Sequence, residues 1–170
     1  QTPQVPAGYD IEFLKVSFAY ENKAETTRTE ALRDITFTAR QGEITALVGP
    51  SGSGKSTVAN LIPRFWDVAE GEIRIGGVNI KNIPTEKLMD IVSFVFQDSF
   101  LFFDTLYENI RVGNSSAGRE EVIAAAKAAQ CHEFIESLPQ GYETRIGDEG
   151  VYLSGGESQR VCVARAILKN

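Results

Sequence analysis

"GPSGSGKST", residues 49–57, follows the apolar run "ITALV" and precedes "VANLIPRF", which is typical of a helix. Gly49, Gly54, Lys55 and Ser56 fill the spacing G-x-x-x-x-G-K-[ST] of a phosphate-binding P-loop. Glycine lets the backbone turn sharply and brings its N–H groups close to a ligand, so that they form a concave site for an anion. A flexible turn that binds nothing is the alternative, but it does not explain why strand, loop, lysine, hydroxyl and helix occur in this order.

Each residue type in this loop has its own chemical use. The helix that follows adds free N–H groups and the positive end of its dipole. Lys55 supplies a point charge to the outer phosphates, and the Ser56 hydroxyl is a hard oxygen ligand that suits Mg²⁺. We therefore predict that a nucleoside triphosphate contacts Gly49, Pro50, Ser51, Gly52, Ser53, Gly54, Lys55, Ser56 and Thr57.

The composition of the 170 residues indicates an ordinary globular domain, because 42% are hydrophobic and 24% are charged. A net charge of -6 argues against a broad nucleic-acid surface, which would need a basic face. No apolar run approaches the roughly 20 residues that cross a bilayer, and the start "QTPQVPAGYD" lacks the features of a signal peptide. Cys131 and Cys162 lack metal-site spacing and are predicted to be buried free thiols in a reducing compartment.

The hydrophobic pattern predicts strands first and helices later. The expected strands are 10–20, 32–39, 42–49, a pair within 71–80 joined by a Gly-Gly turn, and a buried strand at 92–97. The expected helices are 55–63, 85–92, 119–130, 131–138 and 154–169. Val161, Ala164 and Leu168 fall on one face of the last helix, which we expect to be its buried face.

A second motif, "LSGGE" at Leu153–Glu157, opens that last helix. Ser154 and Glu157 have the spacing of a capping box, in which each side chain bonds to the other's backbone N–H. A capping box does not explain Gly155 and Gly156, because glycine weakens a helix. Bare backbone at a helix start instead allows a phosphate to approach.

Together these motifs resemble the nucleotide-binding domain of an ATP-binding cassette (ABC) transporter, from about Ile11 to Asn170. "GPSGSGKST" is similar to that family's Walker A motif, "VFQD" with Gln97 to its Q-loop, and "LSGGESQRVCVARAIL" to its signature motif and helix. Glu157 stands where the family often has glutamine, and either residue can cap a helix.

The resemblance implies an α/β fold: a P-loop NTPase of the ABC ATPase type, with an antiparallel β subdomain, a helical insert and an incomplete core sheet. It divides the chain into a linker (1–9), an ATP-binding core with the β subdomain (10–97) and a helical subdomain that carries the signature motif (98–170).

The resemblance also assigns roles to single residues. Tyr20 matches the aromatic residue that stacks on adenine, although a tyrosine in the core would also fit. Gln97 matches the glutamine that contacts Mg²⁺ and the attacking water, so that Ser56 and Gln97 are the expected metal-site residues. Ser154, Gly155, Gly156 and Glu157 match the signature residues, which in this family close the ATP site of a second domain in a head-to-tail dimer.

Two further stretches resemble the exporter-type cassettes, in which a membrane domain precedes the ATPase in one polypeptide. They are "LFFDTLYENI" at 101–110 and "GYETRIGDEG" at 141–150, and the second is similar to the loop that contacts the coupling helices. The expected location is therefore the cytoplasmic face of the cell membrane, reached through a membrane domain. The fragment itself is expected to be soluble in the sense that it has no transmembrane segment.

The family's Walker B strand, catalytic glutamate and switch histidine follow the signature helix, beyond Asn170. The lone histidine, His132, is expected to be a surface side chain. We therefore expect an ATPase in the full-length parent and little or no hydrolysis by these residues alone. Without the later strands, the apolar stretches 42–49 and 92–97 would lack sheet partners, which predicts poor solubility for the chain alone.

Two alternatives from other classes remain open at this point. One is an ABC-type ATPase that works without a membrane domain, and the other is a degenerate cassette that binds nucleotide without hydrolysing it. The transported substrate, and whether the dimer is made of one chain or two, are not written in this sequence.

Overall fold

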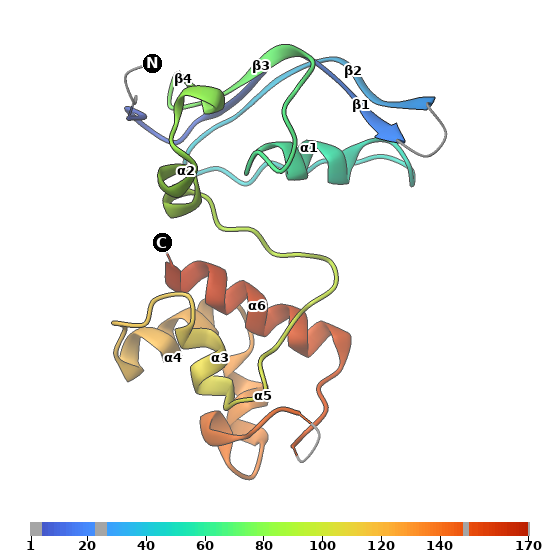
Figure 1. Ribbon diagram of the computed structural model, residues 1–170. Coiled ribbons are helices and arrows are strands. Elements are labelled where there is room, and N and C mark those ends of the chain that lie inside the picture. Colours follow the sequence, from blue (N-terminus) through green and yellow to red (C-terminus); the bar gives the residue numbers. More distant parts are fainter. Residues whose placement is uncertain (1–4, 23–26, 148–149, 170) are drawn as a thin grey trace. The chain divides into compact units, whose positions relative to one another are not determined.

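The computed structural model describes residues 5–22, 27–147 and 150–169 (Figure 1). These residues form two compact units, Gln1–Val92 and Ser93–Asn170. Each unit has its own hydrophobic core. Within the described ranges, no helix is both long and apolar enough to cross a membrane.

The first unit contains a four-stranded antiparallel sheet with the order β2-β1-β3-β4. Its strands are β1 (Ile11–Asn22), β2 (Thr27–Ala39), β3 (Glu70–Ile75) and β4 (Val78–Asn79). Strand β1 pairs with β2 on one side and with β3 on the other, and its Phe13 lies opposite Phe37 of β2 and Ile73 of β3. Phe13 and Ile73 are buried, and the Phe13 and Phe37 rings stack at 4.7 Å, so this row of side chains anchors the core of the sheet.

Two helices of seven residues accompany the sheet: α1 (Lys55–Leu61) and α2 (Thr85–Ile91), the latter preceded by the short turn η1 (Ile80–Asn82). Val58 and Leu61 of α1, together with Leu88 of α2, are buried in the same cluster as the sheet residues. The predicted hairpin with a Gly-Gly turn and both predicted helices of this unit are therefore confirmed.

The predicted strands at 42–49 and 92–97 are not formed: residues 44–49 and 92–96 belong to no helix or strand, and residues 42, 43 and 97 lie in turns or bends. The side chain of Ile44 is 100% exposed and that of Val48 is 92% exposed. Strands of a parallel sheet need hydrogen-bonding neighbours from other parts of the chain. Among the described residues, no strand pairs with either segment, so their apolar sequence alone does not make them strands.

The second unit is helical. Its elements are α3 (Leu106–Arg111), α4 (Arg119–Ala128), α5 (His132–Ser137), the turn η2 (Gly141–Glu143) and α6 (Gly155–Lys169). On α6, Val161 and Ala164 are fully buried and Leu168 packs against the same cluster, as its predicted face requires.

A buried amide holds the loop before α3 in place. The Asn109 side chain accepts a hydrogen bond from the Phe102 N–H (2.8 Å) and donates to the carbonyl oxygens of Phe102 (3.0 Å) and Thr105 (2.9 Å). Arg165 of α6 donates from Nε to the Asn109 carbonyl oxygen (2.8 Å), which ties α6 to α3. Asn109 is 0% exposed, and these bonds satisfy the polar groups that its burial removes from water.

Cys131 and Cys162 are buried and free, as predicted. Burial raises the pKa of the Cys131 thiol to about 11. The prediction for His132 was wrong: the residue is half-buried, and its Nδ1 lies 2.8 Å from the Tyr142 hydroxyl oxygen. Tyr142 is only 2% exposed, so its hydroxyl needs a partner within the protein, and His132 supplies it.

Candidate functional site

The loop at residues 49–57 has a backbone that only glycine adopts readily. Gly52 and Gly54 have φ angles of 80° and 86°, in the left-handed region. A Cβ atom at Gly54 would lie 2.6 Å from Leu32 Cδ2 and 2.7 Å from the Ala31 carbonyl oxygen. Both the conformation and the close packing on β2 therefore require glycine at position 54.

The Lys55 side chain folds back over this loop. Its ammonium group donates to the carbonyl oxygens of Gly49 (2.9 Å) and Pro50 (2.7 Å) and to Ser53 Oγ (3.2 Å). An ammonium group has three N–H donors, and three loop oxygens receive them here. The loop thus holds a positive charge at its centre, where an anion bound by the backbone would meet it.

Backbone donors adjoin this charge at the start of α1. The first bond of the helix runs from the Val58 N–H to the Gly54 carbonyl oxygen (2.9 Å), and no side chain caps Gly54. The N–H groups of residues 54–57 precede that bond, so the helix itself gives them no partner. With the exposed hydroxyl of Ser56, they form a donor set that fits the phosphate groups of a nucleotide and an oxygen ligand for Mg²⁺.

Tyr20, near the end of β1, is brought to this loop. Its hydroxyl oxygen lies 3.1 Å from Thr57 Oγ1, on α1. Its ring stands nearly perpendicular to the rings of Phe18 (4.9 Å between centroids) and Trp66 (5.5 Å). Sequence reasoning missed Trp66, although the aromatic pair at 65–66 directly after the P-loop helix could have drawn attention to it.

The second motif lies in the helical unit and forms the predicted capping box. The Glu157 N–H donates to Ser154 Oγ (3.3 Å), and the Ser154 N–H and hydroxyl both donate to Glu157 Oε2 (2.8 Å each). These hydrogen bonds, first from the Ser154 backbone and then from its side chain, hold the pKa of the Glu157 carboxyl below its usual range.

The two glycines of this motif are not required by the fold. A Cβ at Gly155 would meet no atom within 4 Å, and one at Gly156 would meet only Arg160 Nη1, at 3.9 Å. Neither residue has a positive φ angle. Their backbone is exposed at the start of α6, where an approaching group would find no side chain in its way.

Gln97 also belongs to the second unit, where it is exposed in a bend that follows residues 92–96. Within the units, the structure therefore brings together Tyr20 with Thr57, Lys55 with its loop, and Ser154 with Glu157.

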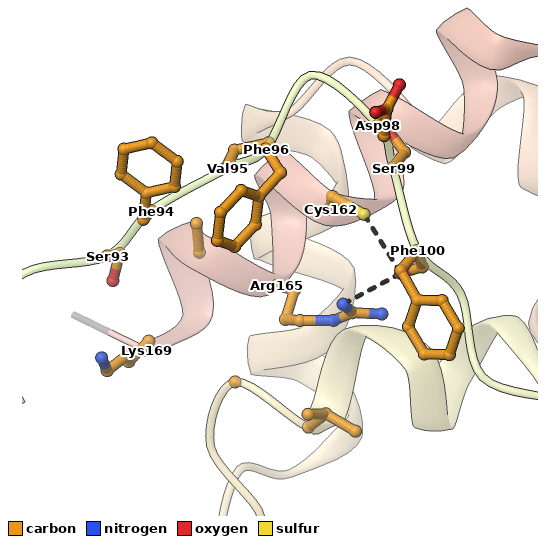
Figure 2. A pocket seen from close by; sticks show the side chains of 13 residues that line it. Ser93, Phe94, Val95, Phe96, Asp98, Ser99, Phe100, Cys162, Arg165 and Lys169 are labelled. Atoms are coloured by element: carbon orange, nitrogen blue, oxygen red, sulfur yellow. Dashed lines mark hydrogen bonds between the residues drawn. The ribbon is translucent and has the colours of Figure 1, made fainter. Parts of the chain in front are cut away.

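A cavity of about 350 Å³ adjoins Gln97 along the chain, between residues 93–100 and the later half of α6 (Figure 2). The Phe100 carbonyl oxygen accepts hydrogen bonds from Arg165 Nη1 (3.2 Å) and Cys162 Sγ (3.5 Å), which hold this segment against α6. Phe94, Phe96 and Phe100 are among the side chains that line the cavity, so much of its wall is apolar.

The family model of the ABC transporter matches residues 32–170, and the chain belongs to this family. A putative multidrug export ATP-binding/permease protein of Bacillus subtilis is 50% identical over 160 residues, which cover 94% of this chain and 27% of that protein. An ATP-dependent lipid A-core flippase of Haemophilus influenzae is 49% identical over 166 residues, which cover 97% of this chain and 28% of the flippase.

Among solved structures, a bacterial Atm1-family ABC exporter with ATP bound is similar at a TM-score of 0.85 and 44% identity. The match covers 98% of this chain and 28% of the exporter chain. The chain therefore resembles the ATP-binding part of exporters, and it spans less than a third of the length of these relatives.

Proposed function

We propose that the chain is the ATP-binding cassette of an exporter-type ABC transporter and that its full-length protein hydrolyses ATP to drive transport across a membrane. The observation that carries the proposal is the loop at 49–57, which combines a backbone that favours glycine, the Lys55 ammonium group and helix-start amides without a side-chain cap. Membership of the ABC transporter family supports the same assignment.

In this proposal the predicted nucleotide-site residues have defined tasks. The amides of residues 54–57 and the Lys55 ammonium bind the phosphates, and the ring of Tyr20 stacks on the adenine base. The Ser56 hydroxyl and Gln97 are the proposed Mg²⁺ ligands, and bound Mg²⁺ would neutralise the charge that develops on the phosphates. These groups bind and orient ATP, while no carboxylate of this chain is assigned as the base that activates water.

The signature motif is proposed to act on a second cassette in a head-to-tail dimer. The open space around Gly155 and Gly156 supports this role, because neither the backbone conformation nor the packing of this chain calls for glycine there. A fused membrane domain is the other proposed partner, since the relatives named ATP-binding/permease protein and flippase are more than three times as long as the matched region. The cassette would then work at the cytoplasmic face of the membrane.

The first test removes the central charge of the loop. Lys55→Ala should raise the Kd for Mg²⁺–ATP by about 10- to 100-fold, because a hydrogen bond to a charged group contributes about 1.5–3 kcal/mol. Isothermal titration calorimetry on the purified chain measures this change. Lys127→Ala is the matched control, because it removes an exposed lysine from α4 in the other unit. Equal affinities of the Lys55→Ala and Lys127→Ala variants would overturn the proposed site.

The second test separates binding from hydrolysis. Ser154→Arg in the full-length transporter should leave ATP binding at its own loop within about twofold. Turnover should fall at least about a hundredfold, because the larger charged side chain would stand where the ATP site of the second cassette is proposed to approach. A hundredfold fall corresponds to about 2.7 kcal/mol of activation barrier. Ser115→Arg, at an exposed serine of the same unit, is the control for the added charge. Normal turnover, or loss of ATP binding at the variant's own loop, would contradict a role across a dimer interface.

A further inference from the structure

A shielded hydrogen bond joins the two halves of the proposed nucleotide site. The Tyr20 hydroxyl oxygen and Thr57 Oγ1 are 3.1 Å apart, and Thr57 is only 6% exposed. Water therefore has little access to the Thr57 hydroxyl, and the tyrosine is the partner that the structure provides. The bond links strand β1, which carries the aromatic ring, to the first turn of α1, which continues the phosphate-binding loop.

Two aromatic side chains contact the ring of Tyr20. Phe18 and Trp66 stand nearly perpendicular to it, at 88° and 87°, and such contacts tolerate sliding and rotation. Phe18 is buried in the core, whereas Trp66 is 44% exposed, so fewer neighbours hold the Trp66 ring in place. A hydrogen bond is directional, so the bond to Thr57 is the contact that sets how far the ring lies from the loop.

We propose that Thr57 is a positioning residue for Tyr20: its hydroxyl holds the aromatic ring at a fixed distance from the phosphate loop, so that the base and the phosphates of one nucleotide are bound together. The inference rests on the proposed function, because it concerns how ATP is bound. It assigns to the Thr57 side chain a task that is separate from any contact of this residue with phosphate.

The test compares a ligand that has a base with one that has none. Mg²⁺–ATP and Mg²⁺–tripolyphosphate both engage the loop, but only ATP reaches Tyr20. Thr57→Val removes the hydroxyl with little change of shape, Thr57→Ser keeps it, and Tyr20→Phe keeps the ring without its hydroxyl. Calorimetry gives the Kd of each variant and of the double variant for both ligands.

Thr57→Val and Tyr20→Phe should each raise the Kd for ATP by about 2- to 10-fold, the usual net effect of one hydrogen bond. Tyr20→Phe should leave the Kd for tripolyphosphate within about twofold, and Thr57→Val should weaken the binding of tripolyphosphate less than that of ATP. The double variant should bind ATP no more weakly than the weaker single variant, because both changes break the same bond. Thr57→Ser should restore ATP binding.

Trp66 supplies an independent measure of ring position. It is the single tryptophan of the chain and lies 5.5 Å from the Tyr20 ring, so its fluorescence should change with ATP in the unchanged chain and change less in Tyr20→Phe. Tyr20→Phe keeps the aromatic packing, and it therefore provides a folded comparison even if Thr57→Val unfolds.

Two results would overturn the inference alone. In the first, Thr57→Val weakens the binding of tripolyphosphate as much as that of ATP, while Tyr20→Phe weakens the binding of neither ligand. This result would mean that the Thr57 hydroxyl contacts the phosphates. In the second, the fold-changes in the Kd for ATP of the two single variants multiply in the double variant, which would mean that Thr57 and Tyr20 act independently. If the unchanged chain binds neither ligand, the proposed function fails and the inference fails with it.

Discussion

The two glycine-containing motifs of this chain differ in why they contain glycine. In the loop at 49–57, Gly54 has a left-handed backbone and lies so close to β2 that a Cβ atom would overlap Leu32 and Ala31. At the start of α6, Gly155 has an ordinary backbone and empty space around it. The first glycine is explained by the fold of the chain itself, and the second is not.

This difference separates two kinds of functional signal. A glycine that the fold requires says little about a ligand, because the protein would need it in any case. A glycine that costs helix stability, and that no neighbour requires, indicates that something outside the chain comes close to the backbone. On this argument the signature glycines point to a partner more directly than Gly54 does.

The largest expected effect is that of Gly54→Ala. A left-handed backbone costs an alanine about 1–2 kcal/mol, and the overlap with Leu32 and Ala31 adds about 1–3 kcal/mol, so the free energy of unfolding of the first unit should fall by about 2–5 kcal/mol. Urea unfolding followed by Trp66 fluorescence reports on this unit alone, because the chain has no other tryptophan. A change in the free energy of unfolding below about 0.5 kcal/mol would show that the fold does not require glycine at position 54, and the contrast with Gly155 would then fail.

Replacing Gly155 with alanine should stabilise the protein, whereas replacing Gly54 should destabilise it. Alanine is favoured over glycine in a helix by about 0.5–1 kcal/mol, and less at a first helical position, so Gly155→Ala should stabilise the start of α6 by a few tenths of a kcal/mol. Hydrogen exchange of the α6 amides measures this gain. Marked destabilisation would mean that the fold requires this glycine after all, and the argument for a partner would then lose its basis.

The smallest expected effect concerns Glu157. Its pKa is lowered in the folded chain, so the charged carboxylate stabilises the helix start above its unfolded pKa of about 4.3, and this contribution is lost as the pH falls through the lower folded pKa. It should amount to at most a few tenths of a kcal/mol, because solvent screens a partly exposed group.

Glu157→Gln keeps a capping side chain that does not titrate. The difference in α6 amide protection between the unchanged chain and this variant should therefore shrink as the pH is lowered below about 4. A difference that stays constant from pH 7 to pH 3 would show that the charge of Glu157 has no part in the cap.

Local patterns predicted the β3–β4 hairpin and most helices because these elements find their partners nearby in the chain. The antiparallel sheet as a whole followed from the family resemblance, since it also pairs distant residues such as Phe13 and Ile73. The Gly-Gly turn returns β4 onto β3, and the capping box starts α6 with its own residues. Family membership and the α/β fold class also followed from the motifs, and the comparisons confirmed them.

The failures came where structure depends on distant partners. The stretches 42–49 and 92–97 have the composition of buried strands, yet a strand exists only when another strand pairs with it. The bond from His132 to Tyr142 and the approach of Trp66 to Tyr20 are likewise contacts between separate elements. No spacing rule along the sequence reports these two contacts, so they could not be predicted.

The burial of Cys131 has a consequence for thiol chemistry. With its pKa raised to about 11, the Cys131 thiol is almost entirely protonated at pH 7, and the thiolate is the form that attacks alkylating reagents and peroxide. Cys131 is also 0% exposed, so a reagent reaches it only when the helical unit opens. The rate at which a maleimide modifies Cys131 in a Cys162→Ser variant would therefore serve as a clock for the opening of that unit.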